Sequence, residues 1–247
     1  DAEADGDAAG VGVTAELRVV DLGARPRVGG SLGLARTPTS VLAAIFGTGD
    51  IVVASIGSTL DATLVAEDFG RDSGSIRVDA AGSRGRLEGT VRGESGAFVV
   101  EEATPLVVTA DFHPVLRDRV LSRILPLFGG VSETDGPLTL TVRSAIVPLS
   151  DGADAAAAEF RAEAGGLLMR PGFDFLSVVA LFDRGVAEDI GGAGPIEARL
   201  EPVSGRLQAG RIVLDATRLV TTKGASVDFA AGSSIDLRDG TMDIRAS

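Results

Sequence analysis

The chain has 247 residues, which is enough for one large all-β domain or two small domains with a sizeable core. Its formal net charge of −12 disfavours a nucleic-acid partner, because such proteins need a basic face to neutralise phosphates. There are no cysteines, which excludes disulfides, cysteine-ligated zinc and thiol nucleophiles, and the single histidine removes histidine-rich metal sites. Hydrophobic residues make up 45% but aromatics only 4%, so the apolar content is aliphatic.

The first ten residues are acidic and polar, and we expect residues 1–10 to be a disordered lead-in. A first β module is predicted over residues 11–112, because apolar residues alternate with small or polar ones and glycine-rich turns separate the segments. One short helix is predicted at 40–46, after Thr37-Pro38-Thr39. The predicted strands of this module cover 11–19, 28–34, 51–56, 60–66, 75–80, 85–91, 97–100 and 105–110. Short turns between consecutive strands indicate antiparallel pairing.

A second β module is predicted over residues 113–247. It opens with an amphipathic helix over 114–128, which His113 precedes as a capping or surface residue and in which Pro126 favours a kink or an early end. A further helix is predicted over 173–182. Strands are predicted at 138–146, 159–169, 196–200, 205–209, 211–215 and 217–222.

Three apolar-Asp-apolar triplets follow near the end of the chain, at 227–229, 235–237 and 242–244. Their alternation predicts an antiparallel meander with one apolar face and one acidic face. The aspartates could form a row that binds a cation, although like charges opposed across strands mostly face water. The residues predicted to line an apolar lipid-binding face are Val227, Phe229, Ile235, Leu237, Met242, Ile244, Ile212 and Leu214.

No catalytic constellation emerges from the sequence. The single histidine lies at a predicted helix start, and the glycine-rich run at 191–195 leads into a strand without a following lysine. Adjacent carboxylates such as Glu101 and Glu102 fall near predicted turns, and there is no Trp or Tyr to form a carbohydrate platform. We therefore predict a protein that is not an enzyme and has no catalytic residues, no metal and no cofactor.

The aliphatic strand faces exceed what about three short helices can cover. Because burial of each large aliphatic side chain contributes about 1.5–3 kcal/mol, these faces must meet something. They could close on each other as a sandwich, or line a groove filled by an apolar ligand.

The segments 205–219, 225–229 and 234–244, the last reading Ile-Asp-Leu-x-x-Gly-x-Met-Asp-Ile, resemble the C-terminal region of AsmA-like proteins, the envelope family that includes AsmA and TamB. The segments 121–126 and 136–149 also look like this family. The resemblance covers roughly residues 30–247. It implies a mainly β fold: an antiparallel meander that forms a strongly curved, groove-like sheet with about three short helices.

The family also implies a function similar to that of bridge-like lipid transfer proteins. A phospholipid or other acyl lipid would lie in an apolar β-groove, in a periplasmic protein tethered to the inner membrane by an N-terminal helix, and would move toward the outer membrane. That anchor helix is missing here, which is consistent with a segment of a longer chain. The alternative is a non-catalytic structural or protein-interaction module of the cell envelope, with a protein partner.

Overall fold

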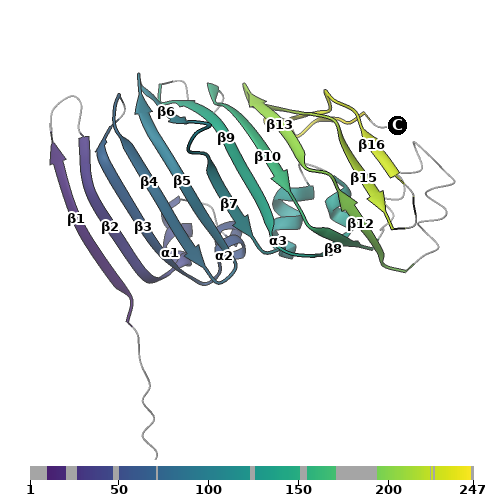
Figure 1. The fold of residues 1–247 in the computed structure, drawn as a ribbon, viewed down its shortest axis with the longest axis horizontal. Helices are drawn as coiled ribbons and strands as arrows, with labels where there is room; N and C mark the ends of the chain where they lie inside the picture. The colour runs from purple at the N-terminus through teal and green to yellow at the C-terminus, as the bar shows by residue number, and fades with distance from the viewer. Residues whose placement is uncertain are drawn as a thin grey trace, which may run out of the picture.

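The computed structural model describes residues 10–20, 27–46, 50–70, 72–122, 126–150, 155–170, 194–222, 224 and 226–245. This part of the chain is mainly antiparallel β-structure, with one large curved sheet, one small sheet and a few short helical segments (Figure 1). The fold class predicted from the sequence is therefore confirmed. The helix predicted over 173–182 and nearly all of the predicted lead-in lie outside the described residues.

The large sheet has thirteen strands, all joined by antiparallel pairs. Its order is β1-β2-β3-β4-β5-β6-β9-β10-β13-β14-β17-β18, and β7 also pairs with both β5 and β9. Because β6 and β7 each bridge β5 and β9, the sheet continues without a break across the predicted module boundary at 112/113. The strands are β1 Gly12–Val20, β2 Arg27–Pro38, β3 Thr59–Phe69, β4 Ser75–Gly82, β5 Gly85–Glu94, β6 Ala97–Val100, β7 Leu106–Ala110, β9 Leu138–Pro148, β10 Ala157–Glu163, β13 Val203–Gln208, β14 Arg211–Leu214, β17 Ser234–Asp236 and β18 Met242–Asp243.

The small sheet has five strands in the order β16-β15-β12-β11-β8. They are β8 Val131–Thr134, β11 Gly166–Met169, β12 Ile196–Leu200, β15 Thr217–Thr221 and β16 Ser226–Phe229. The sequence did not predict β8. The three C-terminal triplets do not form one meander, because 227–229 lies in this sheet whereas β17 and β18 pair in the large sheet.

The single strand predicted over 159–169 is wrong, because the chain bends within it and changes sheets. β10 ends at Glu163 in the large sheet, and β11 begins at Gly166 in the small one. Gly165 allows this bend: a Cβ atom placed there would lie 1.6 Å from the backbone oxygen of Asp135. Only glycine permits so close a backbone approach.

Two helices connect β2 with β3: α1 Thr39–Phe46 and α2 Asp50–Ile56. The strand predicted at 51–56 is therefore wrong. Despite the β-branched run, Asp50 in the first turn favours a helix, and Ala54 becomes 3% exposed against the protein core. Packing of one helical face thus overrides the β-propensity of the sequence. None of the described helices is long and apolar enough to cross a bilayer.

The helix predicted over 114–128 is broken into shorter turns. α3 Pro114–Leu116 continues into a wide turn, η1 Arg117–Leu121, and a tight turn, η2 Pro126–Gly130, follows after a gap in the described residues. In η1, Ser122 donates both its backbone N–H and its hydroxyl (2.6 Å) to the Arg117 carbonyl. The predicted capping role of His113 is confirmed, because its Nδ1 accepts the Val115 N–H at 3.2 Å.

The main core lies between the small sheet and the C-terminal strands of the large sheet. Leu167, Leu219 and Phe229 come from the small sheet, and Leu214 and Ile235 from the large one. Each of these side chains is at most 8% exposed. The C-terminal end of the molecule is therefore a closed two-layer sandwich, whereas the N-terminal strands form a single layer with helices on one side.

We predict that Gly165→Ala destabilises the fold by at least ~2 kcal/mol, because the added methyl forces the bend away from Asp135. Urea unfolding followed by circular dichroism measures the change. Gly194→Ala is the matched control, since a Cβ there meets no atom within 4 Å. Equal stability of the two variants would contradict the role assigned to Gly165.

Candidate functional site

One face of the large sheet carries an unbroken row of aliphatic side chains. We call it the inner face, because α2 packs against it. Cross-strand partners follow one another in register from β1 to β13: Val13, Leu34, Ala62, Ala80, Leu87, Val108, Leu140, Ala162 and Val203. A second row beside it contains Leu32, Leu64, Val78, Val142 and Phe160. Residues directly opposite in neighbouring strands share a face, so the two rows form one apolar surface.

The opposite, outer face of the same strands is mainly polar, with isolated aliphatic side chains such as Val65 and Ile146. Arg86 bridges Asp79 (3.0 Å) and Glu88 (3.1 Å), and Arg92 contacts Glu101 at 2.7 Å. These ion pairs are about half exposed and contribute little to stability. They do keep one face of the sheet wet while the other is aliphatic.

The burial of the inner face changes along the sheet. At the β1 end, Val13 is 63% and Leu17 56% exposed. In the middle, Leu64, Val78 and Val108 are half-buried. At the C-terminal end, Val203 and Leu214 are covered by the small sheet. The apolar surface is thus closed at one end and open toward β1.

Between the helices and the middle strands lies an apolar cavity of about 260 Å³. α2 contributes Ile51, the α3–η1 segment contributes Leu116 and Val120, and Val108 and Leu140 of the sheet lie on the other side. Its few polar lining residues include Ser55, whose hydroxyl donates to the Ile51 carbonyl at 2.7 Å. The volume lies just below the ~300–1,000 Å³ typical of small-molecule pockets. Leu140 connects the cavity to the aliphatic row, since it lines the cavity and is 39% exposed.

The eight residues predicted to bind lipid lie at the C-terminal end and divide into three groups. Ile212, Leu214, Phe229 and Ile235 are in the sandwich core, and Val227 and Ile244 pack against it. Leu237 and Met242 are about half exposed near the β18 edge. The first six already contact other side chains of the protein, whereas the half-exposed aliphatic surface lies in the middle strands. Alternation within those strands was visible in the sequence, but their register was not.

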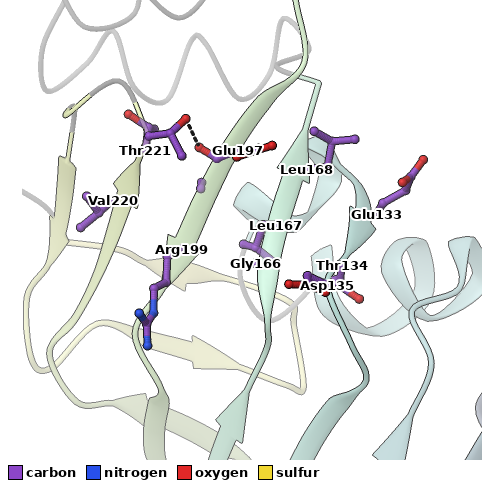
Figure 2. A pocket seen from close by; sticks show the side chains of 12 residues that line it. Glu133, Thr134, Asp135, Gly166, Leu167, Leu168, Glu197, Arg199, Val220 and Thr221 are labelled. Carbon is purple, nitrogen blue, oxygen red and sulfur yellow. Dashed lines mark hydrogen bonds between the residues drawn. The ribbon is translucent and has the colours of Figure 1, made fainter.

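A second, wider hollow of about 850 Å³ lies on the outer face of the small sheet (Figure 2). Glu197 and Arg199 of β12, Glu133 of β8 and Asp135 beside it surround it together with Leu168 and Val220. These charged side chains are exposed, so water screens them. The hollow therefore presents a mixed, open surface and no desolvated polar group for chemistry.

The C-terminal aspartates do not form a cation-binding row, because each has its own arginine. Asp228 contacts Arg218 (2.6 Å), Asp236 contacts Arg238 (2.7 Å) and Asp243 contacts Arg245 (3.1 Å). Within the described part of the chain, no three His, Asp or Glu side chains lie close enough together to hold a metal ion.

Comparison with known proteins gave no match to a family model, to a curated protein or to a solved structure. The AsmA-like resemblance of the C-terminal segments therefore stays a prediction. The fold and the inner face define the class of protein: an antiparallel β protein whose large sheet has one apolar face that is partly open to solvent.

We predict that Arg238→Ala raises the pKa of Asp236. The side chain and then the backbone N–H of Arg238 donate to this carboxylate and lower its pKa to about 2. Because the backbone N–H remains in the variant, the pKa should rise only part of the way toward the ordinary ~3.9.

A carboxyl-detected NMR titration measures this shift. Since the folded pKa lies below the unfolded one, the contribution of Asp236 to stability is present above pH ~4 and is lost as the pH falls through about 2. A pKa of Asp236 that is the same in the variant and the wild type would refute the assignment.

Proposed function

We propose that this chain binds and shields the acyl chains of lipids on the inner face of its large sheet, and so contributes to phospholipid transport or outer-membrane homeostasis. The observation that carries the proposal is the row of nine aliphatic cross-strand partners: Ala62 and Ala80 are buried, but Leu87 and Val108 are half-buried and Leu140 is 39% exposed. Soluble proteins rarely leave so continuous an apolar surface to water unless it binds something.

The dimensions of the inner face suit acyl chains. The eight strands from β1 to β10 along the row, spaced ~4.8 Å apart, extend over roughly 34 Å before the small sheet covers Val203. One leaflet of a bilayer contributes about half of its ~30 Å hydrocarbon core, so the row is longer than a single extended acyl chain. Each methylene removed from water contributes ~0.8 kcal/mol, and ten contribute about 8 kcal/mol before the cost of ordering the chain.

The polar surroundings suit an amphiphile whose headgroup stays in water. Acyl chains would lie across the strands and enter the cavity beside Leu140, while headgroups remain outside. Aliphatic side chains make contacts that depend on shape and have no hydrogen-bond direction, so we expect weak discrimination among lipids.

The AsmA-like resemblance supplies the proposed cellular setting. In that setting the chain is periplasmic, belongs to a protein held at the inner membrane by a segment outside the present sequence, and receives its lipid from a membrane. No catalytic step is proposed.

We predict that Leu140→Arg weakens the binding of a fluorescent fatty acid at least tenfold, because it places a charge in the middle of the aliphatic row. The chain has no Trp or Tyr, so the probe signal is free of tryptophan fluorescence. Ile146→Arg is the matched control. Ile146 lies on the same strand as Leu140 and is 52% exposed, but it faces the outer side, because it pairs with Val99, which in turn pairs with Arg92 of the outer face. We expect it to bind within twofold of the wild type.

Native mass spectrometry of the purified wild-type chain provides the second readout, with co-purified acyl lipid as the expected result. Circular dichroism checks that both variants fold. Absence of acyl lipid, together with equal probe binding by Leu140→Arg and Ile146→Arg, would refute the proposal. It would favour the alternative, a non-catalytic interaction module of the envelope.

A further inference from the structure

The free edge of β1 differs from the other sheet edges in the described part of the chain. β1 has nine residues and pairs with β2 in one uninterrupted register, without proline or bulge. The opposite edge, β18, has two residues, and the edges of the small sheet, β16 and β8, have four each. Short length, bulges, prolines and charged side chains, lysine above all, are the usual protection of an edge against pairing. β1 is long and has no bulge, proline or lysine, and its two charged side chains have opposite signs.

The side chains of β1 also remain uncovered. Val13, Leu17 and Val19 on the inner face are 50–63% exposed, and Glu16 and Arg18 on the outer face are exposed as well. The aliphatic row described above therefore ends abruptly at β1. A strand added there would satisfy the backbone groups of the edge and extend the apolar face.

We propose that the occupant of this edge is β1 of a second copy of the chain. Two copies related by a two-fold axis perpendicular to the sheet would pair antiparallel and keep their inner faces on the same side. Such an axis passes through one residue of β1. The charged side chains Glu16 and Arg18 determine which residue this is.

With the axis at Leu17, Glu16 of each copy lies opposite Arg18 of the other, and Ala15 lies opposite Val19 on the inner face. An axis at Glu16 would instead oppose the two glutamates, and an axis at Arg18 would oppose the two arginines. Opposite charges across strands stabilise a pair and like charges destabilise it. The axis at Leu17 is therefore the favoured register, and it places the inner faces of the two β1 strands side by side through Ala15, Leu17 and Val19.

The absence of cysteine makes this register directly testable. In Leu17→Cys, the two thiols lie opposite each other, with Cα atoms ~5.5 Å apart, and should crosslink almost completely under mild oxidation or with a short bismaleimide. Val13→Cys is the control, because Val13 is equally apolar and 63% exposed. Its two copies would lie eight residues apart along the strands, at about 27 Å. Equal crosslinking of both variants, or of neither, would overturn the proposal.

Charge reversal provides an independent test in the uncrosslinked chain. Sedimentation equilibrium of the wild type should give a dimer, whereas Glu16→Arg and Arg18→Glu should each weaken dimerisation roughly tenfold or more, because two ion pairs become repulsive. The double variant carrying both changes should recover dimerisation. A monomeric wild type, or a double variant as weak as the single ones, would contradict the pairing. Neither test depends on lipid, so this proposal and the proposed function can fail separately.

Discussion

The structure depends on one imbalance: the large sheet has a wide aliphatic face, and the elements that could cover it are few. Removal of aliphatic side chains from water drives folding in proportion to the area covered. At the helix-covered end of the strands, α2 and α3 bury Ala54, Ala110 and Leu116 against each other. At the C-terminal end, the small sheet covers Leu214 and Ile235. Between these two regions Leu87 and Val108 of the aliphatic row stay half-buried, and Leu140 is 39% exposed.

The path of the chain explains why only the C-terminal end closes. From β1 to β7 the strands stay in one sheet, so no second layer can form there. From β8 onward the chain alternates between the two sheets, from β8 to β9, β10 to β11, β12 to β13, β14 to β15 and β16 to β17. Backbone hydrogen bonds hold the crossings together, including the Asp215 N–H to the Ser204 carbonyl (2.9 Å) and the Glu201 N–H to the Arg218 carbonyl (2.8 Å). Each passage into the small sheet adds strands to the second layer, each return adds strands to the first, and the two layers close on each other.

The sequence predicted most strands because period-2 alternation depends on local residues alone. It failed where long-range packing decided the outcome. Ile51–Val53 have high β-propensity yet form a helix, because α2 must bury Ala54. The bend at Gly165 was missed because the atom that requires glycine there, the Asp135 oxygen, is thirty residues away in sequence. The site was misplaced for the same reason: the alternation in β3, β4 and β9 does not reveal which strands are neighbours, and burial of Phe229 or Ile235 depends on a second sheet that the sequence did not predict as a separate layer.

The two surfaces proposed for binding use different chemical groups of the same sheet. Acyl chains would contact side chains of the inner face, whereas a second β1 would pair through backbone groups at the edge and through Glu16 and Arg18 on the outer face. Changes on one face leave the other intact, because successive residues of a strand point to opposite sides. The surfaces are nevertheless linked at Leu17, which lies on the inner face of β1 and is 56% exposed. Pairing there would bring the open β1 ends of the two copies together. The apolar face would double in length without any new fold, and the closed C-terminal ends would lie at its two extremes.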